Sequence, residues 1–329
     1  MKILICGAGG FIGGHLTKNL MEEGHEITCV DIKPLEYWFQ FFESNKNFSL
    51  DLQNYENCLK VTKNIDYVFN LACNMGGMGF IENNKAECML SVLINTNLLK
   101  SCLKNSIKKY LFSSSACVYN ASKQKKVFIA GLKEEDAYPA EPEDGYGWEK
   151  LFSERMCRHF QEDFGLDTRV IRFHNVYGPK GTFDGGREKA PAAICRKIAT
   201  AKIYKNNEIE VWGDGEQSRS FMYIDDCIEG ILKIFNSDYN QPINLGSSEQ
   251  VSINQLINKV EKIASYKVNK IYNLSKPKGV RGRSSDNTKI KKVLNWEPNI
   301  SLDIGLKKTY DWISNQIISG ENTKKYSLF

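Results

Sequence analysis

A glycine-rich loop separates the first β-like run of the chain from its first helical pattern. Residues 2–6 are mostly aliphatic, and the loop at residues 7–13 carries glycine at its first, fourth and seventh positions. The backbone of such a loop can approach a pyrophosphate, which the N–H groups and the partial positive charge of a helix N-terminus then hold. The loop therefore predicts a dinucleotide site at the start of a βαβ unit. We assign to this site Gly7, Gly10, Phe11, Ile12 and Gly13.

The first half of the chain alternates short apolar runs with amphipathic stretches. Strands are expected at residues 2–6, 26–31, 66–70, 109–113 and 168–173, and helices start at Phe11 and Tyr55 and cover 85–104 and 145–164. This alternation is typical of a parallel sheet covered on both faces by helices. We therefore expect an α/β protein with a doubly wound parallel Rossmann sheet.

Beyond Asn175 the chain has longer, glycine-containing loops, and helical patterns return at 191–201, 225–235, 252–264 and 302–318. This change from regular strand–helix alternation to long loops and separate helices predicts a smaller, mixed α/β substrate-binding domain. We expect a dinucleotide-binding domain at residues 1–175, completed by about 222–246, and a discontinuous substrate-binding domain at 176–221 and 247–329.

Charge and cysteine content exclude several classes of protein. Lys and Arg total 44 against 39 Asp and Glu, and they are scattered, which disfavours nucleic-acid binding but allows a basic pocket for a phosphorylated ligand. The apolar run at 88–94 is too short to span a membrane, and the chain enters its first strand at Lys2, so we expect a cytoplasmic protein. The ten cysteines are dispersed without a Cys-x-x-Cys pair, so we expect reduced thiols and no metal.

Two carboxylates follow predicted strands on the expected cofactor side. Asp31 ends the second strand, where it can accept hydrogen bonds from both ribose hydroxyls and would repel a 2′-phosphate. This favours NAD over NADP as the cofactor. Asp51 is placed to meet the adenine edge, although a simple turn at the strand end also accounts for it.

Tyr146 and Lys150 lie four residues apart, and hence on one face of the helix predicted at 145–164. A nearby ammonium and a positive nicotinamide ring would lower the pKa of the phenol and make it a base for a sugar hydroxyl. The spacing alone arises often by chance, but here it accompanies the glycine loop and the serine-rich run that ends at Ser115.

Together these three features resemble the extended short-chain dehydrogenase/reductase family of nucleotide-sugar epimerases and dehydratases. Blocks at 70–80, 114–119, 172–179, 185–193 and 279–287 are similar to its GDP-mannose 3,5-epimerase branch. The resemblance covers nearly the whole chain. It implies NAD as a tightly held cofactor, a GDP-sugar as the substrate, and inversion of C3 and C5 to give GDP-L-galactose or GDP-L-gulose. It also implies a homodimer.

The chemistry of that reaction explains the residues that the resemblance carries over. Oxidation at C4 acidifies the hydrogens at C3 and C5, and an acid/base pair on opposite faces of the ring can then exchange them. The resemblance implies Cys117 as the base and Lys189 as the acid, although a cysteine after a strand is usually buried filler and a lysine is usually solvated. We expect Ser115 to hydrogen-bond the C4 oxygen together with Tyr146.

The remaining site residues also rest on the resemblance. A pyrophosphate favours guanidinium partners, for which we choose Arg219 and Arg283, with Lys197 as a third contact. Leu71 joins Tyr146 and Lys150 among the NAD contacts. The predicted substrate contacts are Gly76, Ser115, Ala116, Cys117, Asn175, Glu188, Lys189, Ala190, Lys197, Gln217, Arg219 and Arg283.

Four other functions stay open at this point. A 4,6-dehydratase needs an Asp-Glu pair after the serine run, where this chain has Ala116 and Cys117, and a C4-epimerase leaves Cys117 and Lys189 unexplained. Departures from the branch at 180–184 and Trp148 could admit a related GDP-sugar such as a GDP-heptose. A non-catalytic NAD sensor would not require these side chains together.

Overall fold

The computed structural model describes residues 1–277, 279–320 and 326, and the predicted substrate domain at 247–329 therefore lies partly outside the described residues. The strands are β1 (Lys2–Cys6), β2 (Glu26–Asp31), β3 (Lys46–Ser49), β4 (Tyr67–Asn70), β5 (Lys109–Ser115), β6 (Asp167–Phe173), β7 (Val176–Tyr177), β8 (Glu208–Trp212), β9 (Ser218–Ser220), β10 (Met222–Tyr223), β11 (Ile243–Leu245), β12 (Gln250–Ser252), β13 (Asn269–Asn273) and β14 (Gly282–Arg283). The helices are α1 (Phe11–Glu22), α2 (Tyr55–Thr62), α3 (Met78–Asn83), α4 (Lys85–Met89), α5 (Ser91–Lys104), α6 (Asp144–Phe164), α7 (Ala190–Ile203), α8 (Ile224–Asn236), α9 (Ile253–Ala264), α10 (Thr288–Leu294) and α11 (Leu302–Ser319).

Within this part of the chain, seven strands form one parallel sheet in the order β11-β6-β5-β4-β1-β2-β3. The order reverses direction at β1, as in a doubly wound sheet, and the crevice outside the carboxyl ends of β1 and β4 is where such sheets bind ligands. The predicted fold class is confirmed.

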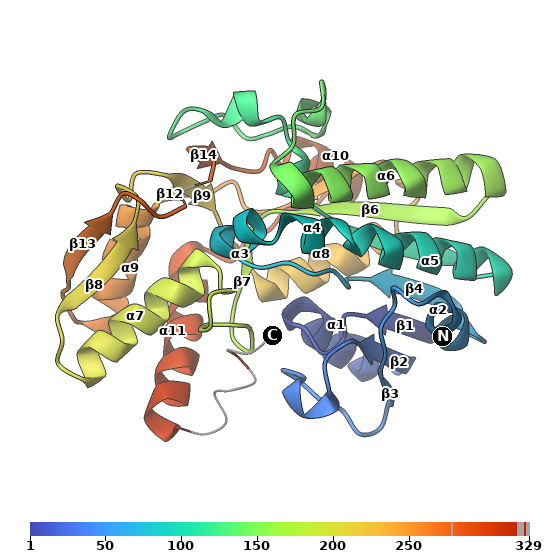
Figure 1. Cartoon of the computed structure of the whole chain (residues 1–329), viewed down its shortest axis with the longest axis horizontal. Coiled ribbons are helices and arrows are strands. Elements are labelled where there is room, and N and C mark those ends of the chain that lie inside the picture. The colour runs from blue at the N-terminus through green and yellow to red at the C-terminus, as the bar shows by residue number, and fades with distance from the viewer. Residues whose placement is uncertain (278, 321–325, 327–329) are drawn as a thin grey trace.

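Alternate residues of the strands serve opposite faces of this sheet. Ile3 and Ile5 belong to the core that includes α1 and α8, whereas Leu4 and Cys6 belong to the core beneath α2, α5 and α6. Side chains of successive strand residues point to opposite faces, so a nearly continuous apolar run is what a sheet with two covered faces requires. Figure 1 shows α5 and α6 running together along the sheet.

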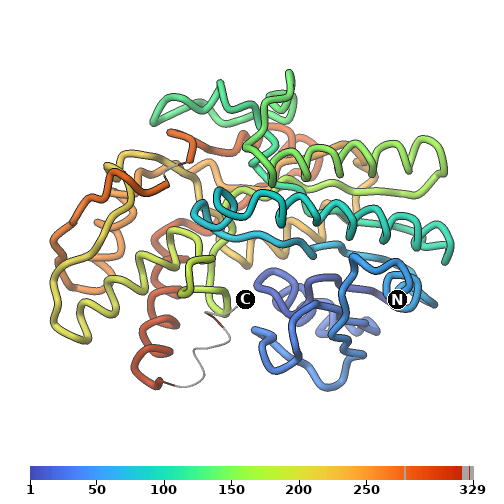
Figure 2. The backbone as a smooth tube through the Cα atoms, in the orientation of Figure 1, coloured from blue at the N-terminus to red at the C-terminus, as the bar shows by residue number. Residues whose placement is uncertain are grey.

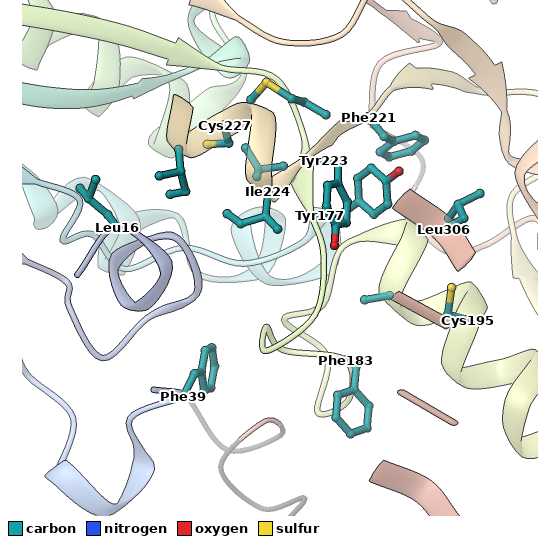
Figure 3. Packing of buried hydrophobic residues seen from close by; sticks show 14 of the residues in the cluster. Leu16, Phe39, Tyr177, Phe183, Cys195, Phe221, Tyr223, Ile224, Cys227 and Leu306 are labelled. Atoms are coloured by element: carbon teal, nitrogen blue, oxygen red, sulfur yellow. The ribbon is translucent and has the colours of Figure 1, made fainter. Parts of the chain in front are cut away.

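A smaller lobe, formed by β8, β9, β12, β13, β14, α7, α9 and α11, shares the hydrophobic core that contains Ile3 and Ile5. Its strands pair as β13 with β8 and in the order β12-β9-β14, and α7, α9 and α11 pack together beside them (Figure 1). Figure 2 shows the chain passing from the sheet to this lobe after β6, returning for α8 and β11, and leaving again. In Figure 3, Leu16 of α1 and Leu306 of α11 belong to one apolar cluster, so a continuous core joins the sheet to the smaller lobe.

Most predicted elements have ends within two residues of those in the structure. Two of the differences have a clear physical cause. The helix expected at 85–104 is divided at Leu90, where the Leu93 N–H bonds the Leu90 carbonyl three residues back and tightens the turn. The strand expected at 109–113 continues to Ser115, because its residues 113–115 still pair with β6. The helix expected at 252–264 begins after its N-cap Ser252, with Gln255 completing a capping box.

Candidate active site

The glycine loop forms a tight turn between β1 and α1. Gly7 has a φ of 81°, and a Cβ at Gly13 would lie 2.8 Å from the Ala8 Cα and closer still to the Gly7 carbonyl oxygen. Gly10 is the N-cap of α1 and no side chain caps the helix there. The loop therefore presents backbone N–H groups at a helix N-terminus, which is the arrangement that holds the pyrophosphate of NAD.

Asp31 lies beside this loop at the end of β2. Its carboxylate is 8% exposed and accepts a hydrogen bond of 3.0 Å from the Lys33 backbone N–H. Burial raises the pKa of Asp31, while the charge of Lys33 opposes that rise. The Lys33 ammonium donates to the Gly9 carbonyl at 2.6 Å, a contact that sequence reasoning missed. Asp31 is thus held close to the loop, as a ribose-binding carboxylate requires.

Leu71 and Asp51, two further predicted cofactor contacts, follow different strands of the sheet. Leu71 follows β4 and donates its backbone N–H to the Cys6 carbonyl at 3.0 Å, which places its backbone against Gly7. Asp51 is exposed and accepts a hydrogen bond of 2.8 Å from the Gln53 N–H in the turn before α2. The adenine contact of Asp51 stays a prediction.

The first turns of α6 bring Tyr146 and Lys150 to the carboxyl end of β5. Tyr146 is 6% exposed, and the Lys150 ammonium lies 5.6 Å from its ring centroid. Burial lowers the pKa of Lys150, but the neighbouring Cys73 and Glu149 side chains outweigh this effect and leave it raised. Lys150 therefore remains a cation although it is almost completely buried.

Burial raises the pKa of the Tyr146 phenol well above its ordinary value, and Cys73 and Cys117 add to the rise. A hydrogen bond with the Ser115 hydroxyl lowers this pKa, but by less than the other neighbours raise it. The lowering expected from the sequence therefore needs a positive charge beyond these neighbours, such as the nicotinamide ring of NAD. Cys73, which interacts with both Tyr146 and Lys150, was missed by sequence reasoning.

Cys117 lies in a short 3-10 helix (Ala116–Val118) that begins directly after β5. Its side chain is 8% exposed, and its backbone N–H donates to the Ser115 hydroxyl at 3.2 Å. The guanidinium of Arg283 donates to the Cys117 sulfur at 3.5 Å. Burial raises the pKa of the thiol and Glu143 raises it further, whereas Arg283, Ser115 and Lys189 lower it.

Lys189 is the N-cap of α7 and reaches the same cluster from the other lobe. Burial lowers the pKa of its ammonium, and the charge of Cys117 opposes that effect. The backbone fixes this approach, because the Gly77 N–H donates to the Arg187 carbonyl at 3.0 Å and a Cβ at Gly77 would lie 2.6 Å from the Glu188 carbonyl oxygen. The structure thus brings the predicted acid and base into electrostatic contact.

Arg219 and Arg283 are paired neighbours in the parallel ladder of β9 and β14. Both are less than one-tenth exposed, and burial together with Arg283 lowers the pKa of Arg219 to about 10. Gln217 precedes β9 and donates to the Trp212 carbonyl at 2.9 Å. Asn175 donates to the Ser220 carbonyl at 3.2 Å, so it too lies beside β9. These predicted substrate residues share one region.

Other predicted substrate residues have local partners. Glu188 accepts from the Gly186 N–H at 2.7 Å and from Arg196 at 3.2 Å, and Lys197 donates to the Glu210 carbonyl at 2.6 Å. Ala190 begins α7, Ala116 is buried beside Cys117, and a Cβ at Gly76 would meet the Phe80 side chain at 2.7 Å. Their roles toward a substrate stay predictions.

Two further observations concern regions outside this cluster. His174 is fully buried, lies 3.0 Å from the Asn244 side-chain oxygen, and has its pKa lowered by burial to about 3. A surface groove of about 810 Å³ between α1, α8 and α10 is lined by residues such as Lys18 and Asp225 and by none of the predicted site residues. Among the described residues, no cluster of potential ligands could hold a metal ion, and no helix is both long and apolar enough to cross a membrane.

Comparison with known proteins identifies the family. A model of the NAD dependent epimerase/dehydratase family matches residues 3–246. GDP-mannose 3,5-epimerase of Arabidopsis thaliana is 47% identical over 320 residues, which cover 96% of this chain and 83% of that protein. The chain belongs to the NAD dependent epimerase/dehydratase family. The predicted enzyme class and the NAD cofactor are thereby confirmed.

More distant members of this family share the whole architecture. UDP-glucuronate 4-epimerase of Thermodesulfobacterium geofontis is 31% identical, covering 95% of this chain and 96% of that protein. The crystal structure of UDP-glucose 4-epimerase from Thermotoga maritima with UDP-glucose superposes with a TM-score of 0.86 at 27% identity, covering 96% of this chain and all (100%) of the other. UDP-glucuronic acid 4-epimerase from Bacillus cereus, solved with UDP-glucuronic acid and NAD, gives 0.81 at 26% identity, covering 96% and 99%.

Proposed function

We propose that this family member is a GDP-mannose 3,5-epimerase that inverts C3 and C5 of its substrate. One observation of the structure carries the proposal: Cys117 packs against Tyr146 in one buried cluster, and the backbone contact of Gly77 with Arg187 brings the loop that precedes Lys189 to this cluster from the other lobe. A C4-epimerase needs no such acid/base pair. The relative from Arabidopsis thaliana, which is 47% identical and named for this reaction, supports the same substrate.

The glycine loop, Asp31 and Leu71 would hold NAD, which supplies the oxidant for C4 and then returns the electrons. Tyr146, as the phenolate, accepts the proton of the C4 hydroxyl and becomes the phenol, and the positive charge of Lys150 stabilises that phenolate beforehand. The Ser115 hydroxyl interacts with Tyr146 and can hydrogen-bond the C4 oxygen as charge develops on it. The burial of this group excludes water from the ketone that forms on the sugar.

Proton exchange at the neighbouring carbons falls to Cys117 and Lys189. The thiolate takes the C–H proton, leaving an enolate whose charge the C4 oxygen carries, and the ammonium gives its proton to the same carbon from the opposite face. Arg283 stabilises the thiolate through its contact with the sulfur. Exchange with water returns the thiol to the thiolate and the amine to the ammonium. The same exchange at the second carbon then inverts it too, and returning the electrons to C4 completes the reaction.

Substrate recognition would combine both lobes. We propose that Arg219 binds the pyrophosphate of the GDP-sugar, with Gln217 and Asn175 beside it and Arg283 at the junction with the sugar. The loop that contains Glu188 and the first turn of α7 would cover the opposite side of the GDP-sugar, and Lys197 would be a further phosphate contact. A guanidinium suits a pyrophosphate because it donates two parallel hydrogen bonds.

The test is incubation with GDP-mannose in heavy water, with deuterium followed at C3 and C5 by NMR. We expect exchange at both carbons without net accumulation of reduced cofactor. Cys117→Ala is expected to abolish exchange and to preserve NAD binding. A 6-deoxy-4-keto product would instead establish dehydration, and full epimerase activity of Cys117→Ala would remove the thiol from the mechanism.

Three broader features belong to this proposal. We propose that the enzyme acts in the cytoplasm and forms a homodimer. We also propose that residues 1–175 with 222–246 bind NAD, while 176–221 with 247–329 bind the sugar nucleotide. The large sheet draws its strands from the first set, and β8, β9, β12, β13 and β14 come from the second. A dehydratase is not favoured, because Ala116 and Cys117 stand where it needs an Asp-Glu pair.

A further inference from the structure

Glu143 immediately precedes α6 and belongs to the Cys117 cluster, although no step above uses it. Its side chain is 13% exposed, and its carboxylate lies 2.8 Å from the Arg283 guanidinium. Its backbone N–H donates to the Cys117 carbonyl at 3.0 Å, and its own carbonyl accepts from the Gly147 N–H at 2.7 Å. The backbone therefore fixes this carboxylate at the start of the helix that carries Tyr146.

Arg283 links Glu143 to the sulfur. Its Nε donates to the Gln124 side-chain oxygen at 2.7 Å, its Nη1 donates to the Cys117 sulfur at 3.5 Å, and its Nη2 faces Glu143. The last contact is a close ion pair rather than an aligned hydrogen bond. Removing the carboxylate charge would therefore change the electrostatics at the sulfur, while Gln124 would still hold the guanidinium.

Charged and titratable groups surround the thiol from several elements. Glu143 and Tyr146 come from the start of α6, Arg283 and Arg219 from the β9–β14 pair, and Lys189 from the start of α7. Cys73 after β4 and Cys88 of α4 face the same group, and Ser115 lies at the end of β5. Glu149, a second buried carboxylate of the cluster, lies 3.6 Å from Lys150, so it is Glu143 that supplies the negative charge beside the sulfur.

A carboxylate near a thiolate makes the sulfur hold a proton more tightly, so the thiolate is rarer but is a stronger base. Proton removal next to a ketone is demanding, and a stronger base favours it. The same carboxylate favours the ammonium form of Lys189, which the reaction also needs. A single negative charge at this point thus supports the required state of the acid and the strength of the base.

We propose that Glu143 makes Cys117 a stronger base for C–H proton removal, by setting a negative charge against the sulfur that offsets the guanidinium of Arg283. The inference rests on the proposed epimerase reaction. In that reaction the C–H bond breaks, an S–H bond forms on Cys117, and Glu143 stays ionised throughout. Glu143 is thus a positioning residue that acts through Cys117 and Arg283.

The test compares Glu143→Gln with wild type in two assays. The first is the rate of alkylation of Cys117 by iodoacetamide against pH, read by peptide-resolved mass spectrometry without substrate, because the thiolate is the reacting form. A nearby charge shifts a pKa by about 1 unit, so we expect the midpoint to fall by about 1 pH unit. The roughly tenfold gain in thiolate is partly offset by its lower nucleophilicity, so alkylation below both midpoints should be roughly threefold faster.

The second assay is deuterium exchange with GDP-mannose against pH. The variant should reach its plateau at lower pH, and the plateau rate should be several-fold lower because the base is weaker. Glu141→Gln removes an exposed carboxylate two residues earlier and is the matched control, with both profiles unchanged. A wild-type alkylation midpoint in Glu143→Gln, or an equal shift in Glu141→Gln, would overturn the proposal.

The Asp variant keeps the inference testable if Glu143→Gln does not fold. Glu143→Asp moves the carboxylate away from the sulfur by the length of one methylene. Its alkylation midpoint should therefore lie between those of wild type and Glu143→Gln. If Glu143→Gln does not fold, the midpoint of Glu143→Asp should still lie below that of wild type. An unchanged midpoint there overturns the proposal. Alkylation needs no GDP-sugar, so a wild-type enzyme without deuterium exchange refutes the proposed function, and an unshifted alkylation midpoint refutes the role of Glu143.

Discussion

Replacing Gly13 by Ala tests the geometry of the cofactor loop. A Cβ at this position would lie 2.8 Å from both the Ala8 Cα and the Gly7 carbonyl carbon, and closer still to the Gly7 oxygen. All three are backbone atoms, so no side-chain rotation can relieve the overlap. The loop must move away from α1, and the N–H groups that face the pyrophosphate move with it.

The magnitude follows from the contacts. Overpacking a closed site costs about 1–3 kcal/mol, and a backbone overlap belongs at the upper end, so we expect a loss of about 3 kcal/mol in the free energy of unfolding. For a chain of 329 residues, that loss corresponds to a fall of roughly 4 °C in Tm. We expect the Kd for NAD to rise at least tenfold, which corresponds to about 1.4 kcal/mol.

The assays are denaturant unfolding and titration with NAD. Gly24→Ala is the matched control, because Gly24 has a φ of 82° and a Cβ there meets no atom within 4 Å. It should cost about 1 kcal/mol through backbone strain alone and leave the Kd for NAD unchanged. Wild-type NAD affinity in Gly13→Ala, or an equal loss of affinity in Gly24→Ala, would refute the reasoning.

Two further predictions concern buried polar groups. Arg172→Met removes both hydrogen bonds that the guanidinium makes to the Glu154 carboxylate, at 2.9 and 2.7 Å, and should cost about 3–5 kcal/mol in denaturant unfolding. Lys46→Met breaks an exposed ion pair and should cost less than about 1 kcal/mol, and equal losses would contradict the argument. The pKa of His174 is lowered to about 3, below its unfolded value, so its contribution to stability is complete above about pH 6.5 and is lost as pH falls, by about 1.4 kcal/mol per unit. His174→Gln should remove that part of the pH dependence of unfolding, and an identical slope in wild type and variant would contradict it.

Much of the fold could be predicted because its signals are local. Nearly continuous apolar runs place side chains on both faces of a sheet, and amphipathic stretches between them form the helices that cover those faces. This alternation specifies the parallel sheet and its helices. The break at Leu90 was not predictable, because the residues on both sides continue the helical pattern and only the tightened turn separates α4 from α5.

The sequence predicted those residues of the candidate site that lie close together along the chain, and it missed contacts between residues that are far apart along it. Tyr146 and Lys150 are one helical turn apart, so their sequence spacing places them together. Cys117 and Lys189 were found only by resemblance to a family. Gln124 and Glu143 were missed, because their partner Arg283 is 159 residues from Gln124 and no local pattern links them.

The sequence by itself determined the layered α/β architecture, the glycine loop and the helix face of Tyr146, since each depends on residues within a few positions of one another. The tertiary structure decided which charges surround Cys117. Arg283 reaches the sulfur across 166 residues of sequence, and Glu143 meets Arg283 only because β14 and the start of α6 are neighbours in space. Electrostatic effects depend on distance and burial, which are properties of the folded chain. The residues of the proposed acid/base site could therefore be named from the resemblance of the sequence to a family, whereas the balance of charges among them came only from the fold.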